Sequence, residues 1–189
     1  MKKLFVLVCV MTLTMTMSAK ITWNAKGGVG IATLWDTYSN LNTKLVGKLG
    51  VGIEKPLSAN WSLMPSFEVA WKGFKVEYWG GSGSDLHFNF LYLQIPIVAA
   101  YRINLSEDWN MALKAGPYIG QAVYNHYYYK GHTGEYEIEK LDAGLDVGID
   151  FEHHRFVIGV EAEMGFLKLE KYSDGGRNLA FYATIGWKF

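Results

Sequence analysis

The feature that most constrains this sequence is a strict alternation of apolar and polar residues. Between Leu141 and Glu152, an apolar residue occupies every odd position, and aspartate, glycine or glutamate occupies every even one. The segment from Leu179 to Phe189 alternates in the same way. A period of two places the two sets of residues on opposite faces of a β-strand. The chain is therefore predicted to be all-β from residue 20 onward, since no segment there shows the 3.6-residue period of a helix.

Six further segments carry the same alternation, so eight strands are predicted in total. Most of them have an apolar face about as long as the 9–11 residues that a tilted membrane-spanning strand needs. The six segments are Ile21–Trp35, Leu45–Ile53, Trp61–Trp71, Leu91–Ile103, Trp109–Val123 and Phe156–Phe166.

The connections between these segments alternate in length. Short turns on one side and long loops on the other are typical of an outer-membrane barrel. We therefore predict an eight-stranded antiparallel up-and-down transmembrane β-barrel, with both termini at the end of the short turns. The short connections are Glu54–Asn60, Asn104–Asp108 and Glu152–Arg155, and the longer ones are Asp36–Thr43, Gly80–Leu86, Asn125–Lys140 and Glu170–Asn178.

The first residues have the pattern of a secretory signal peptide. Lys2 and Lys3 precede an apolar stretch over residues 4–17, and Ser18 and Ala19 are small residues suited to a cleavage site. We predict a signal peptide over residues 1–19 and a barrel domain over residues 20–189. The single cysteine, Cys9, lies in the signal, so the mature chain has no disulfide bond.

The composition excludes some classes and leaves others open. The 18 Lys+Arg residues balance the 18 Asp+Glu residues, which argues against nucleic-acid binding. Alternation alone also fits a soluble β-sandwich or a lipocalin-like barrel. The signal peptide, the loop asymmetry, the final Phe189 and a predicted aromatic girdle near the periplasmic interface favour the membrane barrel. The girdle residues are Trp61, Trp109, Phe151, Phe156, Trp187 and Phe189.

Charged residues lie on the face of the strands that we assign to the barrel lumen. With Phe151 paired to Phe156, Asp146 faces Glu161, and glycines such as Gly50 and Gly148 leave room for long side chains to cross. Buried charges are normally paired, so we favour a salt-bridge network that fills the lumen over a cation or ligand site. The predicted network contains Lys26, Lys48, Glu68, Lys114, Asp142, Asp146, Glu161 and Glu163.

Two prolines fall inside predicted strands, where a missing amide donor interrupts the hydrogen-bond ladder. Pairing Ile103 with Trp109 aligns Pro96 with Gly116, next to Pro117 in the adjacent strand. We therefore expect a bulge or kink at this height.

The sequence predicts no catalytic, cofactor-binding or metal site. The adjacent His153 and His154 are expected to point apart in a surface turn. The loop from Asn125 to Glu137 is rich in tyrosine and histidine, which suits contact with sugar or protein, but tyrosine-rich rims are common in barrels, and we favour a structural role for these residues. Residues Ser173, Asp174, His126 and His132 are the loop candidates for a lipid-modifying enzyme, but no nucleophile motif accompanies them.

With the strands placed, the chain resembles the PorT-like outer-membrane β-barrel family of Gram-negative bacteria over nearly its whole mature length. The resemblance implies insertion in the outer membrane and a barrel of about eight strands, and it carries no catalytic residue. The matching stretches are Leu91–Ile97 (LYLQIPI), Ala100–Arg102 (AYR), Lys114–Gly120 (KAGPYIG) and Asp142–Gly148 (DAGLDVG).

These observations favour a non-enzymatic barrel of the cell outer membrane with a structural or surface-binding role through its long loops. A narrow porin-like channel and a lipid-modifying enzyme remain as alternatives. The expected partners are outer-membrane lipids and a surface ligand or protein at the loops, with no cofactor and no nucleic acid. The protein is expected to be a monomer.

Overall fold

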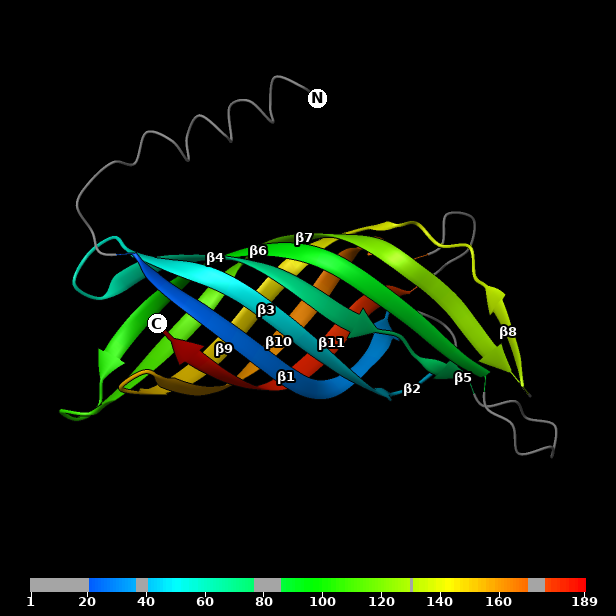
Figure 1. Ribbon diagram of the computed structural model, residues 1–189. Coiled ribbons are helices and arrows are strands. Elements are labelled where there is room, and N and C mark those ends of the chain that lie inside the picture. The colour runs from blue at the N-terminus through cyan, green and yellow to red at the C-terminus, as the bar shows by residue number, and fades with distance from the viewer. Residues whose placement is uncertain (1–20, 37–40, 77–85, 130, 170–175) are drawn as a thin grey trace, which may run out of the picture.

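The computed structural model describes residues 21–36, 41–76, 86–129, 131–169 and 176–189. Eight long strands wind around one axis in Figure 1, with the C-terminus at the end away from the short strands β5 (Lys75–Val76) and β8 (His132–Glu135). The long strands are β1 (Thr22–Trp35), β3 (Lys44–Pro56), β4 (Trp61–Lys72), β6 (Leu86–Asn104), β7 (Trp109–Tyr129), β9 (Leu141–His153), β10 (Phe156–Lys168) and β11 (Arg177–Lys188).

The eight long strands form a closed antiparallel ring. Each pairs with the next long strand along the chain, and β11 pairs with β1 to close the sheet. Three short strands, β2 (Leu41–Asn42), β5 (Lys75–Val76) and β8 (His132–Glu135), extend the sheet at the end opposite the C-terminus. Within the described ranges, no helix is long and apolar enough to cross a membrane. The predicted signal peptide and parts of all four predicted long loops lie outside the described residues.

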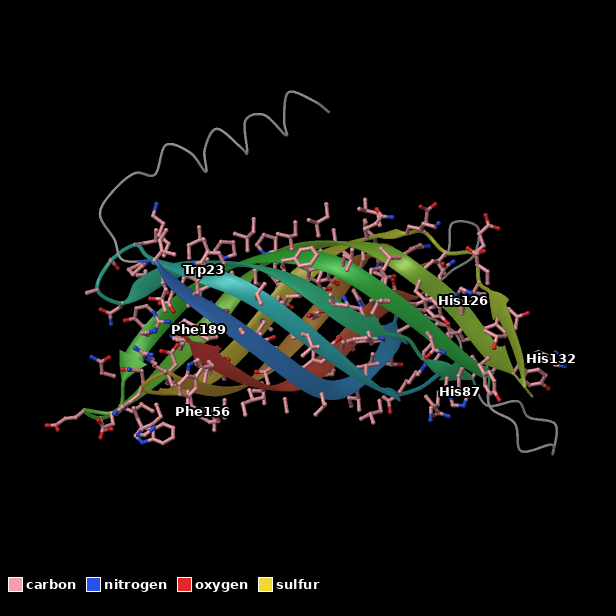
Figure 2. All side chains as sticks on the ribbon, in the orientation of Figure 1. Trp23, His87, His126, His132, Phe156 and Phe189 are labelled. Carbon is pink, nitrogen blue, oxygen red and sulfur yellow. The ribbon has the colours of Figure 1, made fainter. Side chains whose placement is uncertain are left out.

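The wall of the barrel is apolar on its outer face. Side chains such as Val29, Leu45, Ile119 and Val160 are more than half exposed, while the residues between them point inward. Figure 2 shows the outer side chains standing away from the ribbon around its whole length. The period-2 alternation is therefore the reason for an apolar exterior around a polar interior, an arrangement suited to lipid.

Two of the short turns are built alike. The Ser58 hydroxyl accepts a hydrogen bond from the Trp61 amide at 3.2 Å, and Ser106 accepts one from Trp109 at the same distance. In both turns the tryptophan carbonyl accepts the amides of the serine and of the residue before it. The repeated Leu-Ser-x-x-Trp sequence thus encodes the same turn twice.

The register of the β9–β10 hairpin differs from the prediction by two residues. Phe156 pairs with His153 rather than with Phe151, so Asp146 lies opposite Glu163 instead of Glu161. The cause is a two-residue turn in which His154 has a positive φ of 57°, as the first central residue of a type II′ hairpin turn does. The same turn stacks the rings of His153 and His154 at 4.5 Å, against the expectation that they point apart.

The extracellular end also departs from the prediction. Part of the expected loop Asn125–Lys140 is strand, because β7 continues to Tyr129 and pairs with β8. The β6–β7 register shifts where Leu91 faces Tyr124 and Tyr92 faces Ala122. Val123 therefore has no partner in β6, and this extra residue of β7 forms a β-bulge. Beyond the bulge, the outward and inward positions of β7 are exchanged.

The prolines lie two residues away from their predicted alignment. Pro96 faces Tyr118, and pairing resumes at Ala99 opposite Ala115 in the same register. The ladder is interrupted between these pairs without the register shift that a bulge requires. The prolines thus interrupt the ladder without the predicted bulge, and the β-bulge of this hairpin is a separate feature at Leu91 and Tyr92.

Candidate functional site

The lumen contains two ion pairs that are built in the same way. Lys26 of β1 lies beside Gly50 of β3, which lies beside Glu68 of β4. Because Gly50 has no side chain, the Lys26 ammonium group crosses it and reaches Glu68 at 2.8 Å. A Cβ at Gly50 would lie only 2.7 Å from Glu68 Cγ. The glycine is thus part of the ion-pair geometry.

The second pair lies on the other side of the barrel. Lys114 of β7, Gly148 of β9 and Glu161 of β10 stand in one row across three strands. Lys114 crosses the glycine and reaches Glu161 at 2.6 Å. A Cβ at Gly148 would lie 3.0 Å from Glu161 Cγ and 3.2 Å from Lys114 Cε. The sheet register and the glycine together determine this contact.

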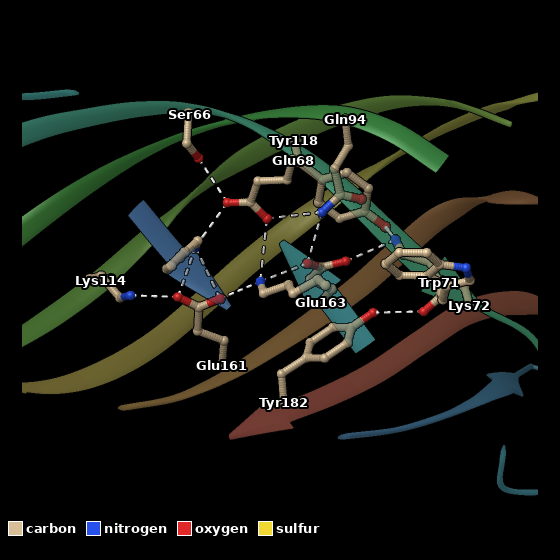
Figure 3. A network of polar contacts seen from close by, with 12 residues as sticks. Ser66, Glu68, Trp71, Lys72, Gln94, Lys114, Tyr118, Glu161, Glu163 and Tyr182 are labelled. Atoms are coloured by element: carbon tan, nitrogen blue, oxygen red, sulfur yellow. Dashed lines mark hydrogen bonds and ion pairs between the residues drawn. The ribbon is translucent and has the colours of Figure 1, made fainter. Parts of the chain in front are cut away.

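Lysine side chains join the two rows into one network (Figure 3). Lys26 also contacts Glu161, at 2.9 Å. The ammonium group of Lys48, on β3, contacts Glu161, lies 3.0 Å from Glu163 and lies 3.4 Å from Glu68. The side chains of Lys48, Glu68 and Glu163 are fully buried.

Towards the extracellular end the network continues through Lys72. Its ammonium group lies 2.9 Å from Glu163 and 3.2 Å from Asp142. The Tyr118 hydroxyl lies 3.0 Å from Asp142, and the Gln94 side-chain amide donates to Glu163 at 2.8 Å. The network therefore crosses the lumen, from β4 to β9 and β10 on the opposite wall.

The central network contains more carboxylates than lysines. Asp146 is 3% exposed and forms no ion pair at contact distance with a described residue, although Lys48 and Lys26 act on it at longer range. Asp150 does have a contact, at 2.7 Å from Lys114. Four buried or half-buried lysines (Lys26, Lys48, Lys72, Lys114) thus face six buried carboxylates (Glu68, Asp142, Asp146, Asp150, Glu161, Glu163).

A separate charge cluster closes the periplasmic end. Arg102 lies 2.9 Å from Glu152 and 2.5 Å from Glu54. Lys188 lies 2.8 Å from Glu152 and 3.0 Å from Glu54, so two cations share two carboxylates. The sequence analysis did not assign these four residues to the network, although strand parity places each of them on the inner face. A cavity of about 40 Å³ lies between this cluster and the central network.

An apolar cluster, here called the apolar cap, fills the extracellular end of the lumen. Phe74 and Phe88 stack with ring centroids 4.5 Å apart, and Tyr136 meets Phe88 edge-on at 4.6 Å. The sequence analysis missed the cap, because several of its members lie beyond the alternating segments. The buried members are Phe74, Phe88, Phe90, Tyr92, Ala122, Ile138 and Leu169.

The residues assigned to the aromatic girdle all point outward at the end of the barrel that holds the C-terminus. Trp61, Trp109 and Phe156 begin their strands, and Phe189 follows the last one. Figure 2 places Phe156 and Phe189 together at this end, near Trp23. The six exposed fractions are Trp61 48%, Trp109 40%, Phe151 40%, Phe156 36%, Trp187 46% and Phe189 67%.

Of the four loop candidates for an enzyme, the two described histidines do not lie side by side. His126 stacks on Tyr124 at 4.2 Å, whereas His132 lies at the other end of the hairpin, opposite Tyr129. Ser173 and Asp174 lie outside the described residues. In the described part of the chain, no group of three or more His, Cys, Asp or Glu side chains is arranged to hold a metal ion.

A closed eight-stranded antiparallel sheet with an apolar outer wall and a charged lumen defines a membrane β-barrel. The sequence matches the outer membrane protein beta-barrel domain family over residues 16–170, and the chain belongs to this family. It is an outer-membrane β-barrel protein. No curated protein matches the sequence significantly.

Solved structures have the same fold at low sequence identity. The crystal structure of Neisserial surface protein A aligns with a TM-score of 0.54 and 11% identity, covering 92% of this chain and 100% of that one. The outer membrane protein OprG from Pseudomonas aeruginosa aligns with a TM-score of 0.52 and 8% identity, covering 90% of this chain and 97% of that one. At these identities the likeness concerns the fold alone.

Proposed function

We propose that this protein is a non-enzymatic, monomeric outer-membrane barrel with a closed lumen, which binds a surface ligand or a protein through its extracellular end. The observation that carries the proposal is the filling of the lumen at three successive levels. The periplasmic cluster around Arg102, the central network around Glu161 and the apolar cap around Phe90 follow one another along the axis. An eight-stranded barrel is narrow enough for side chains to fill it.

The surface-binding part of the proposal is supported by the β7–β8 hairpin. It extends the sheet beyond the long strands, and Tyr128 on it is 49% exposed. Tyrosine combines a large apolar ring with a hydroxyl group, which suits contact with sugars and proteins. The hairpin is therefore the segment from which we expect recognition to occur.

The proposal also includes a place in the PorT-like group and a cleaved signal peptide. The stretches LYLQIPI and KAGPYIG support a place in the PorT-like group of the family. The charged start and the small residues Ser18 and Ala19 support a cleaved signal peptide over residues 1–19. Mass spectrometry of the outer-membrane form should therefore give an N-terminus within a residue or two of Lys20, and retention of the first residues would refute cleavage.

Planar-bilayer recordings test the closed lumen. The refolded protein should give no stable conductance steps, because three layers of side chains obstruct the axis. Reproducible steps that change with Asp146→Asn or Glu161→Gln would refute the closed lumen and favour the narrow channel. Turnover of outer-membrane lipid that is abolished by His126→Ala would instead favour the enzyme.

The binding role is tested by capture from the bacterium's surroundings or its surface. Wild-type protein and a variant in which residues 131–135 are replaced by a glycine–serine linker, which leaves Tyr136 and Ile138 of the cap in place, are compared as baits. A heat-modifiable gel shift checks that both baits fold. A partner retained only by the wild type supports binding through the hairpin, and equal capture by both baits contradicts it.

A further inference from the structure

We propose that a groove in the periplasmic half of the outer wall holds one acyl chain of an inner-leaflet phospholipid, and that the phosphate of this lipid binds Arg155. The inference goes beyond the proposed function, and it does not depend on what the extracellular end recognises. It rests on two rows of outward side chains with a low point on β1, on the depth that these rows span in the membrane and on an arginine at their periplasmic end.

The groove is defined by the sheet register. A row of directly paired residues crosses five neighbouring strands, and a second row lies two residues nearer the extracellular end on each strand. Directly opposed residues of antiparallel strands point to the same face, which here is the outer one. The first row is Phe156, Trp187, Ala25, Val51 and Phe67, and the second is Ile158, Ile185, Gly27, Leu49 and Val69.

Two small residues on β1 make the low point of both rows. Ala25 and Gly27 lie between larger side chains of β11 on one side and of β3 on the other. The result is an apolar groove of about 610 Å³, called here the wall groove. A chain lying in a groove buries more apolar surface than a chain lying on a convex wall, so it is held more tightly.

The rows climb from the periplasmic interface to the middle of the membrane. Phe156 is the first residue of β10, whereas Phe67 lies six residues beyond Trp61, the first residue of β4. Four gaps between strands of about 4.8 Å each, at a tilt near 45°, give a rise of roughly 14 Å along the membrane normal. Half of a hydrocarbon core of about 30 Å is roughly 15 Å. The wall groove therefore matches the depth of one leaflet, the inner one.

Arg155 supplies positive charge at the periplasmic end of the wall groove. It directly precedes Phe156, and its carbonyl oxygen accepts the Lys188 amide at 2.8 Å, so it lies beside the ends of β10 and β11. The carboxylates of the periplasmic cluster are already shared by Arg102 and Lys188. Within the described residues, the exposed guanidinium group of Arg155 forms no ion pair. A guanidinium group without a carboxylate is complementary to a phosphate.

The negative charge next to this turn lies on its other side. Asp108 Oδ1 is 3.8 Å from His154 Nε2, and Asp108 precedes β7, which pairs with β9 and not with β11. On the side of the wall groove, Arg155 is followed by Phe156 and Trp187 of the aromatic girdle, whose rings suit the headgroup boundary. A phosphate at Arg155 therefore continues directly into a chain over Ala25.

Native mass spectrometry of the refolded full-length barrel tests recognition of the phosphate. The probes are phosphatidylglycerol and the diacylglycerol with the same chains, which lacks the phosphate. We expect phosphatidylglycerol to bind about fivefold more tightly and Arg155→Gln to remove that preference, as for one cation at a membrane surface. The matched control is Lys140→Gln, which removes an exposed extracellular lysine and should leave both affinities unchanged.

A second pair of variants tests the wall groove itself. Ala25→Leu fills the low point and should weaken binding of both lipids roughly tenfold, the effect of keeping about two methylene groups out of the groove. Ala115→Leu makes the same change at an exposed outward alanine of β7, outside the two rows, and should have no effect. A heat-modifiable gel shift of each variant separates loss of binding from loss of folding.

Several results would overturn the proposal. Equal affinities for the two lipids, or equal effects of Arg155→Gln and Lys140→Gln, would show that Arg155 does not recognise the phosphate. Equal effects of Ala25→Leu and Ala115→Leu would mean that lipids contact the wall without using the groove. A wild-type dimer that is abolished by Ala25→Leu, with lipid binding unchanged, would make a second copy of the chain the occupant of the groove.

Discussion

The central network and the apolar cap fill one barrel in two different ways. In the network, each of the four lysines contacts at least two carboxylates, through side chains aligned by the sheet register. In the cap, buried side chains come from strand ends and from the connections, as Phe74, Ile138 and Leu169 show, and they meet through ring and methyl contacts.

Strand register matters more for the central network than for the apolar cap. A buried ion pair depends on direction and distance, and removal of one partner leaves an uncompensated charge. An apolar cluster depends mainly on filled volume, and it tolerates substitutions that preserve that volume. The network should therefore be sensitive to loss of a single charge, and the cap should be sensitive only to loss of volume.

The largest expected effect is that of Lys48→Met. The substitution keeps an unbranched side chain but removes the cation shared by Glu68, Glu161 and Glu163. We expect the free energy of unfolding to fall by about 3–5 kcal/mol, as for other broken buried ion pairs. Urea-induced unfolding of the refolded barrel in micelles, followed by tryptophan fluorescence, measures the change.

Lys140→Met is the matched control for that experiment. Lys140 is exposed on the extracellular side, so its replacement should change the free energy of unfolding by less than about 0.5 kcal/mol. If both substitutions cost the same, the charge of Lys48 contributes nothing specific to the network.

The next largest effect should be found in the cap. Leu169→Ala removes a side chain that is 3% exposed, and we expect a loss of about 2–5 kcal/mol. Leu169→Met keeps the volume and should cost less than about 1.5 kcal/mol. Bilayer recordings of Leu169→Ala should stay free of conductance steps, because the network beneath the cap remains closed. A similar loss in both variants would show that the cap is as specific as the network.

The same contrast explains what the sequence could and could not predict. The alternation around Leu141–Glu152 predicted the strands and the inward face, because a period of two is a local property. It also placed Gly148 beside the long side chains. The register of the β9–β10 hairpin was wrong by two residues, since a tight turn at His154 was not distinguished from a wider one.

The cap could not be predicted for a different reason. Phe74 follows a glycine with a φ of 149°, and Ile138 lies in a segment without regular structure, so neither shows periodicity. Their burial depends on how the connections fold back over the barrel end. The periplasmic cluster could have been predicted, because Arg102 and Lys188 occupy inward positions in the alternation of their strands.

A smaller effect is expected from the glycines of the crossing ion pairs. In Gly50→Ala the new Cβ would lie 2.7 Å from Glu68 Cγ and displace the carboxylate from Lys26. We expect a cost of about 1–3 kcal/mol, the range for overpacking. Gly27→Ala is the control, since its Cβ would meet the flexible end of Leu49 at 3.1 Å and the Lys48 carbonyl oxygen at an ordinary contact distance of 3.9 Å. Equal unfolding midpoints for both variants would contradict the role of Gly50.

The smallest effect, and the one of opposite sign, is expected for Asp146→Asn. The network holds six carboxylates and four lysines, and Asp146 has no ion pair at contact distance with a described residue, so its neutralisation reduces the excess of negative charge. We expect the free energy of unfolding to rise, by less than about 1 kcal/mol. Asp150→Asn is nearly isosteric too, but it breaks a 2.7 Å contact with Lys114 and should destabilise the barrel. If Asp146→Asn lowered the free energy of unfolding as much as Asp150→Asn, the four lysines of the network would have to be shared among all six carboxylates. The central network would then be balanced in charge, like the periplasmic cluster.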